Sequence, residues 1–196
     1  MQLPVQTFLD LVEKTHRLCA FDLEASGLSG DYNSILVVSI KPFGKPPIVR
    51  TCKEPGDDEA LVKWAVDELG NYDCWVSYYG RGYDMKMLRS RLLDAGCTYD
   101  LPYKHHIDLY FSVVASKLNP GHKSQGHVIS WLYPEDKQDA KIMQKMTVSA
   151  KVWNEVLKSS TRAKALKTLS ERCGRDTIGL QGLYTKTRHL IKDITR

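Results

Sequence analysis

The segment CAFDLEA, residues 19–25, constrains the fold of this chain more than any other stretch. It predicts a central β-strand over Leu18–Glu24, because apolar side chains fall on both faces. Asp22 and Glu24 interrupt this strand two positions apart, so both side chains leave the same face. Two carboxylates placed in this way repel each other unless a cation lies between them, and a divalent ion with oxygen ligands is the natural partner. The alternative is a pair of solvated acids at the end of a strand.

The remaining pattern predicts a mixed α/β sheet with helices packed on it. Further strands are expected at Ser34–Ile40, around Ile48–Cys52, at Cys74–Tyr79 and near His105–Ile107. The close spacing of the first three strands indicates an antiparallel meander. Helices are expected in the N-terminal segment, at Asp57–Leu69, Tyr83–Ala95 and Asp108–Leu118, and over most of the chain after Ser124. We therefore expect one domain, residues 1–196, with a helical C-terminal third.

Composition narrows the class of protein. The five cysteines are odd in number and lack CxxC spacing, which argues against a disulfide framework or a cysteine zinc site and favours an intracellular protein. No apolar run approaches the roughly 18 residues of a membrane span, and no signal peptide is evident. Residues 1–116 hold 12 Lys and Arg against 16 Asp and Glu, whereas residues 117–196 hold 16 against 7. This asymmetry suits a nuclease, although a solvated lysine-rich helical surface gives the same count.

Two more acids lie where chemistry is expected. Asp84 follows the expected strand Cys74–Tyr79 at a strand-to-helix junction, where ligands gather in α/β sheets, but it could instead cap its helix. Asp176 shares a helical stripe with Leu169, Cys173 and Leu180, so it is an acid on a buried face that needs a partner. An acid at the edge of the stripe, or one paired with a neighbouring arginine, is the alternative.

The order of these acids resembles the motifs of the DEDD superfamily of 3′–5′ exonucleases, and most closely the exonuclease domains related to family-B DNA polymerases. FDLEASGL resembles the first motif, D-x-E-T-T-G-L. VSYYGRGYDMKML resembles the second, N-G-x-x-[FY]-D, through Gly80, Tyr83 and Asp84. HHIDLY resembles the element that follows it and contains Asp108, and RCGRDTIGLQGLY resembles the third motif, ending at Asp176. The resemblance covers nearly the whole chain and implies a ribonuclease H-like fold.

The resemblance also implies an activity and its cofactors. The protein would hydrolyse phosphodiester bonds of a single-stranded 3′ end, with DNA favoured over RNA, by a two-metal mechanism. Two Mg²⁺ or Mn²⁺ ions would be held by Asp22, Glu24, Asp84 and Asp176. Because the chain has no polymerase domain, a replication or repair partner would act in trans. Basic residues would track the nucleic-acid backbone, among them Lys117, Lys123, Lys141, Lys145 and Lys151.

The sequence departs from the family pattern where water is activated. The family has Tyr four residues before the last Asp, or His five before it, and this chain has Arg172 and Glu171. Glu171 is a candidate base, with a solvated helix acid as the alternative, and Arg172 is a candidate contact to the scissile phosphate. Tyr79 stands where the family has Asn; Tyr79, or Tyr78 beside it, is a candidate for stacking on a base, with a core tyrosine as the alternative. Leu28, after the tight turn at Gly27, matches a family position that touches the terminal nucleotide, which makes both residues candidates for the substrate site; an ordinary packed leucine is the alternative.

Two other hypotheses remain open at the level of the sequence. A structure-selective endonuclease on the same fold would use the same acids. A catalytically silent domain that binds nucleic acid or docks a partner is suggested by the absent Tyr and His, while the presence of all four acids argues against it.

Overall fold

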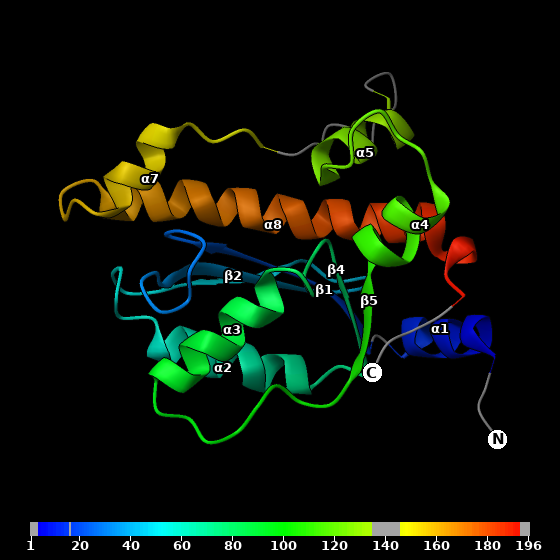
Figure 1. Cartoon of the computed structure of the whole chain (residues 1–196), viewed down its shortest axis with the longest axis horizontal. Helices are drawn as coiled ribbons and strands as arrows, with labels where there is room; N and C mark the ends of the chain where they lie inside the picture. The colour runs from blue at the N-terminus through cyan, green and yellow to red at the C-terminus, as the bar shows by residue number, and fades with distance from the viewer. Residues whose placement is uncertain (1–3, 16, 135–145, 193–196) are drawn as a thin grey trace.

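A five-stranded mixed sheet forms the centre of the molecule in the computed structural model, which describes residues 4–15, 17–134 and 146–192 (Figure 1). The strands lie in the order β3-β2-β1-β4-β5. They are β1 (Leu18–Ala25), β2 (Ile35–Pro42), β3 (Ile48–Thr51), β4 (Cys74–Ser77) and β5 (His105–Asp108). The first three strands pair antiparallel, whereas β4 runs parallel to β1 and β5 parallel to β4. The predicted meander and mixed sheet are therefore confirmed, with β1 at the centre.

Helices cover both faces of this sheet. The long helix α8 (Arg162–Thr187) crosses one face, and α2 (Glu59–Gly70) and α3 (Asp84–Asp94) cover the other (Figure 1). The other described elements are α1 (Val5–Lys14), the π-helical turn η1 (Tyr110–Val114), α4 (Ala115–Lys117), α5 (Gln125–Leu132), α7 (Ala150–Val156) and the 3₁₀ turn η2 (Arg188–Leu190). None of the helices in the described part of the chain is long and apolar enough to cross a membrane.

Three predicted elements differ from the structure. The strand expected at Cys74–Tyr79 ends at Ser77, because Tyr79 adopts a left-handed φ of 63° that a strand cannot accommodate. The helix expected from Asp57 begins at Glu59. The helix expected over Asp108–Leu118 is instead a π-helical turn followed by a short α-helical turn.

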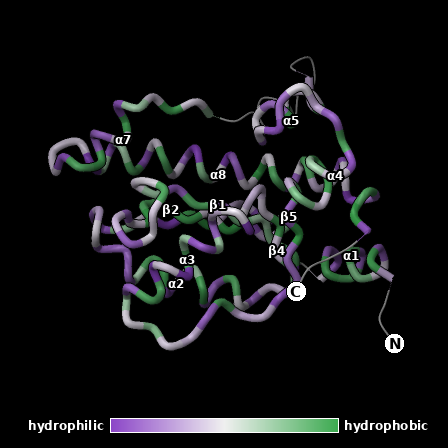
Figure 2. The backbone as a smooth tube through the Cα atoms, viewed as in Figure 1, coloured by the Kyte–Doolittle hydropathy of each residue, from purple (hydrophilic) through white to green (hydrophobic). Residues whose placement is uncertain are grey.

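The apolar residues lie between the sheet and its helices. Figure 2 shows hydrophobic backbone positions concentrated on the strands and on the helix faces that meet them. Phe21 and Leu23 of β1 are buried in the same cluster as residues of α2 and α3, and Leu169 of α8 is also fully buried. All five cysteines are buried and free, as expected of small core residues. This packing fixes the position of β1 relative to α8, and the candidate site lies between them.

Candidate functional site

Three carboxylates from distant segments meet where β1 faces α8. Asp22, Glu24 and Asp176 each offer a carboxylate oxygen, and these oxygens all lie within 4.8 Å of one another. Glu24 and Asp176 are buried, with 8% and 3% of their surfaces exposed. The thiol of Cys173, one turn before Asp176, contacts a carboxylate oxygen of Asp22 at 3.5 Å. The alternation of the strand and the period of the helix thus bring three of the predicted acids together.

A side-chain hydrogen bond fixes the register between the helix and the sheet at this point. Ser39 of β2 lies directly opposite Asp22, and its hydroxyl shares a 2.8 Å hydrogen bond with that of Thr177 on α8. On the other side of the helix, the buried amide of Gln125 donates to the carbonyl oxygen of Asp176 at 2.9 Å. The helix therefore cannot slide without breaking buried hydrogen bonds, and Asp176 stays beside the β1 acids.

Asp84, the fourth predicted acid, is not part of that group of three but lines the same pocket. It is the first residue of α3 and 5% exposed. Tyr83, not Asp84, is the N-cap residue, so the capping alternative is wrong. Burial raises the pKa of Asp84 to about 7; hydrogen bonds from the backbone amides of Asp84 and Leu23 oppose this shift, and the nearby Asp108 and Glu24 carboxylates add to it.

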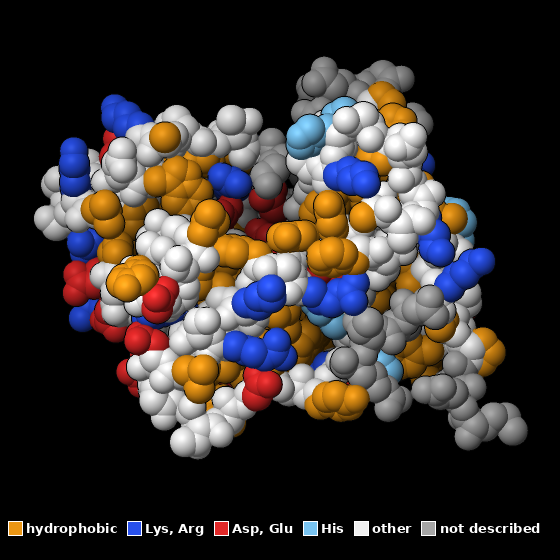
Figure 3. All heavy atoms as spheres, viewed as in Figure 1, with side chains coloured by type: hydrophobic (Ala, Val, Ile, Leu, Met, Phe, Trp, Pro, Cys, Tyr) orange, Lys and Arg blue, Asp and Glu red, His pale blue; other side chains and the backbone are white. Residues whose placement is uncertain are grey.

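These acids line an open hollow of about 390 Å³ between β1, α3, α5 and α8. Figure 3 shows acidic side chains on the floor of a hollow near the upper centre of the view. Of the predicted substrate residues, Leu28, Tyr79 and Arg172 line it. The hollow is also lined by Tyr78, the alternative stacking residue, by the motif residue Tyr83, and by Leu23, Ser124 and Gln125, for which the sequence predicted no role in a site. Tyr78 and Tyr83 belong to the quoted second motif, whereas nothing in the local sequence marks Ser124 or Gln125.

Two predicted residues lie away from the lining. Gly27 is not a lining residue, but its carbonyl oxygen accepts a 2.7 Å hydrogen bond from the hydroxyl of Tyr83, which is one. Glu171 is exposed on α8 and does not line the hollow. Neighbouring residues on a helix point about 100° apart, so Arg172 facing the acids turns Glu171 toward solvent.

The donor set fits a hard divalent cation. Three carboxylates within reach of one another supply only oxygen, which suits Mg²⁺ or Mn²⁺ better than zinc. Asp22, Glu24 and Asp176 form the group of potential metal ligands found among the described residues. His122 and His127, whose ring centroids lie 6.0 Å apart, do not belong to that group.

Arg172 lies inside the acidic site. Its Nε atom is 2.8 Å from Oε1 of Glu24 and 3.8 Å from Oδ2 of Asp176. Its guanidinium carbon is 5.7 Å from the ring centroid of Trp153 on α7. The sequence predicted a pocket-facing arginine but not the ion pair with Glu24.

A backbone loop after β4 presents Tyr79 at the rim of the hollow. The wholly buried Asp108 carboxylate accepts hydrogen bonds from the backbone amides of Tyr79 at 3.0 Å and Arg81 at 2.9 Å, and from that of Tyr110 at 3.1 Å. A Cβ atom on Gly82 would come within 2.5 Å of the Tyr79 ring, so a larger residue there would displace the ring from its position. Asp108 thus ties the segment after β4 to the segment after β5 and holds Tyr79 in its left-handed conformation.

Aromatic rings extend this rim. Tyr79 is 45% exposed and stacks on Phe111, with ring centroids 5.4 Å apart and planes 25° apart. Tyr110 packs edge-on against both rings. The Arg81 guanidinium lies 4.9 Å from the centroid of Phe111. We call Tyr79, Tyr110 and Phe111 the aromatic rim; it offers flat apolar faces beside a charged hollow.

The fold and this site agree with the comparisons to known proteins. A model of the RNase H superfamily matches residues 19–188, so this chain belongs to that superfamily. The predicted ribonuclease H-like fold is thereby confirmed.

One solved structure gives a closer structural counterpart. The family B DNA polymerase from the hyperthermophilic archaeon Pyrobaculum calidifontis superposes with a TM-score of 0.66 and 17% identity, over 87% of this chain and 24% of the polymerase chain. At this identity the likeness shows the fold, and this chain spans about a quarter of the polymerase. No curated protein sequence matches the chain.

Proposed function

We propose that this protein is a metal-dependent 3′–5′ exonuclease that hydrolyses the phosphodiester bonds of single-stranded nucleic acid, with DNA favoured. The observation that carries the proposal is the meeting of Asp22, Glu24 and Asp176 on the floor of an open hollow in an RNase H superfamily fold. The similarity to a DNA polymerase supports the preference for DNA. The catalytic unit would be one domain, residues 1–196, acting with a replication or repair partner in trans.

The four acids would form the catalytic centre. Asp22, Glu24, Asp84 and Asp176 would hold two Mg²⁺ or Mn²⁺ ions, whose chemistry when bound is to activate water and to stabilise the leaving oxygen. The protein supplies a rigid set of carboxylates from β1, α3 and α8, with Asp22 and Asp176 held by contacts within the core. Arg172 would contact the scissile phosphate from the same wall of the hollow.

The rim of the hollow would hold the 3′ end of the strand. Leu28 is 86% exposed at one edge, and its apolar side chain would contact the terminal nucleotide, positioned by the turn at Gly27. Tyr79 would stack on a base, since a single-stranded substrate presents unpaired aromatic faces. Lys117, Lys123 and Lys151 would contact phosphates; Lys141 and Lys145 lie outside the described residues.

A silent nucleic-acid-binding domain is the second candidate, and one observation favours it. Arg172 occupies the helix position at which the resembling family has its water-activating tyrosine, and Glu171 points to solvent. Such a domain would bind single strands without cleaving them.

A ladder assay separates these possibilities. A 5′-labelled single-stranded DNA and a matched RNA are incubated with the full chain in Mg²⁺ or Mn²⁺, alongside a circular single-stranded DNA. Stepwise shortening of the linear strand with survival of the circle is expected; cutting of the circle would indicate an endonuclease. Asp176→Asn should lower the rate at least about 100-fold, because each carboxylate helps to stabilise several kcal/mol of transition-state charge. Asp67→Asn, an exposed acid on α2, is the matched control. Binding without cleavage in either metal would overturn the exonuclease proposal.

A further inference from the structure

Arg172 supplies a fixed positive charge within the acidic site. Its side chain is 19% exposed, and a guanidinium keeps its proton at every accessible pH. The two acids it approaches, Glu24 at 2.8 Å and Asp176 at 3.8 Å, both belong to the group of three potential metal ligands. Arg172 therefore neutralises part of the charge that a divalent ion would otherwise neutralise.

The backbone holds this arrangement in place. Arg172 and Asp176 are four residues apart on α8, so their side chains share one helix face. Glu24 reaches them from β1, whose register against β2 places its side chain on the α8 side of the sheet. A cation bound by Glu24 and Asp176 would meet the guanidinium at short range in a site largely removed from water, where like charges repel strongly.

We propose that Arg172 is a resident counter-ion that competes with divalent ions for Glu24 and Asp176 and so lowers the affinity of the site for metal. This inference rests on the proposed function, which makes these acids metal ligands. The half-buried ring of Trp153, 5.7 Å from the guanidinium carbon, offers a second contact for the side chain when a metal ion takes the carboxylates. Arginine can make this shift by side-chain rotation alone.

Metal binding without nucleic acid tests the inference directly. Mn²⁺ affinity of the full chain is measured by the electron paramagnetic resonance signal of free Mn²⁺, and thermal unfolding is followed with chelator and with Mn²⁺. Arg172→Gln is expected to bind Mn²⁺ at least about five-fold more tightly, within the usual range for coupling between two sites. It should also unfold at a lower temperature in chelator and gain more from Mn²⁺ than the wild type. Arg175→Gln, which removes the same charge from an exposed position on α8, should bind like the wild type.

The possible results separate this inference from the proposed function. If wild type binds Mn²⁺ and Asp22→Asn does not, the metal site stands; equal or weaker binding by Arg172→Gln then overturns the counter-ion role alone. If neither wild type nor Arg172→Gln binds Mn²⁺ at this site, both the inference and the proposed metal centre fail. Should Arg172→Gln not fold in chelator, Arg172→Lys serves instead: its rotatable ammonium fits the two carboxylates less well, so tighter Mn²⁺ binding than wild type supports competition, and unchanged binding contradicts it.

Discussion

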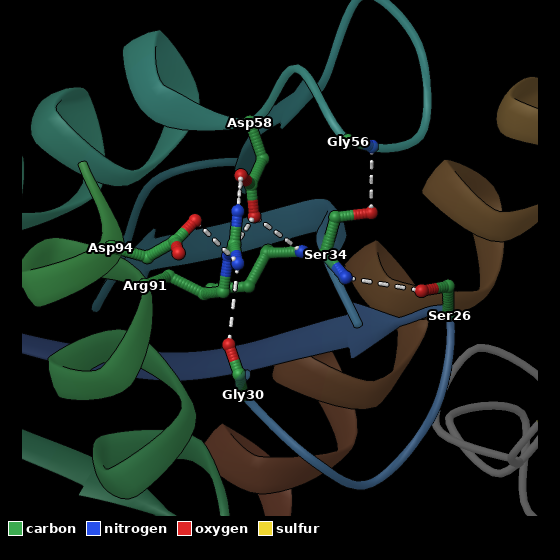
Figure 4. Close-up of polar contacts among 8 residues, drawn as sticks. Ser26, Gly30, Ser34, Gly56, Asp58, Arg91 and Asp94 are labelled. Carbon is green, nitrogen blue, oxygen red and sulfur yellow. Dashed lines mark hydrogen bonds and ion pairs between the residues drawn. The ribbon is translucent and has the colours of Figure 1, made fainter. Parts of the chain in front are cut away.

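Two buried charge clusters in this protein are built in opposite ways. In the first, shown in Figure 4, the Arg91 guanidinium forms a two-pronged ion pair with Asp58, with nitrogen–oxygen distances of 2.7 and 3.0 Å. Asp94 and the carbonyl oxygen of Gly30 accept further contacts from Arg91, and the backbone amide of Ile35 donates to Asp58 at 2.7 Å. The two buried charges, Arg91 and Asp58, match, whereas the Asp94 side chain is 56% exposed, so this cluster is a structural tie between α3, the start of α2 and the start of β2.

The acidic site has an excess of one sign. Asp22, Glu24 and Asp176 face one arginine, Arg172, with Asp84 close by. An unbalanced buried cluster costs stability unless a ligand supplies the missing charge, and such clusters mark functional sites. Both clusters are buried, so the balance between positive and negative charges, rather than burial, distinguishes the structural cluster from the candidate catalytic one.

The largest expected change is a loss of stability when the balanced cluster is broken. Asp58→Ala leaves the Arg91 charge without its main partner and the Ile35 amide without its acceptor, so it should lower the free energy of unfolding by about 3–5 kcal/mol. Urea unfolding measures this. Asp100→Ala breaks the exposed Arg89–Asp100 pair and should cost no more than about 1 kcal/mol. Equal losses in the two variants would contradict the structural role of the buried pair.

The unbalanced cluster should respond in the opposite sense. Asp22→Asn removes one negative charge from a site where like charges repel, so unfolding in chelator should occur at the same or a higher urea concentration than for the wild type. The same substitution should lower the proposed nuclease activity at least about 100-fold, because it removes one of the proposed metal ligands. A large loss of stability in chelator would mean that Asp22 is a structural acid.

A buried histidine extends the comparison, because it avoids unbalanced charge by staying neutral. Burial lowers the pKa of His106 to about 4, with help from the positive charges of Arg81 and Arg89, and its Nε2 lies 2.8 Å from the Ser77 hydroxyl oxygen. The unfolded chain binds this proton near pH 6.5, so stability should fall as the pH drops from 6.5 toward 4. His106 should therefore lower the free energy of unfolding by about 2 kcal/mol at pH 5 compared with pH 7.

Urea unfolding of His106→Gln at both pH values tests this assignment. The difference in unfolding free energy between pH 7 and pH 5 should shrink by about 2 kcal/mol in the variant. An unchanged difference would show that other groups cause the loss of stability in acid.

The smallest expected effect is at the aromatic rim, which carries no net excess of charge. Tyr79→Asn removes the ring while keeping a residue that tolerates the left-handed φ of 63°. Loss of one base stack should weaken the binding of single-stranded DNA about ten-fold, measured by fluorescence anisotropy with Asp22→Asn as a non-cleaving background. Tyr103→Ala removes a 78% exposed ring that does not line the hollow, and its affinity should match the background. If the background protein and both variants bind DNA equally well, Tyr79 does not contact the substrate.

Local patterns were sufficient to predict the framework. Strand alternation put Asp22 and Glu24 on one face, and helical spacing put Asp176 on the buried stripe of α8; both features follow from backbone geometry alone. The predicted bounds of strands and helices were wrong where a side chain from a distant segment determines the local backbone conformation. Asp108 accepts hydrogen bonds from the segment after β4, where Tyr79 has a left-handed φ. Asp58 is the N-cap residue of α2, but its carboxylate binds Arg91 and makes no capping hydrogen bond to the helix.

The sequence by itself thus determined the order of strands and helices and the face on which each acid lies, because these depend on periods of two and 3.6 residues. Only the tertiary structure decided which charge meets which. Arg172 pairs with Glu24 across the gap between α8 and β1, and Arg91 pairs with Asp58 rather than with another acid. Such pairings depend on how the elements pack in three dimensions, and no local period in the sequence encodes that packing.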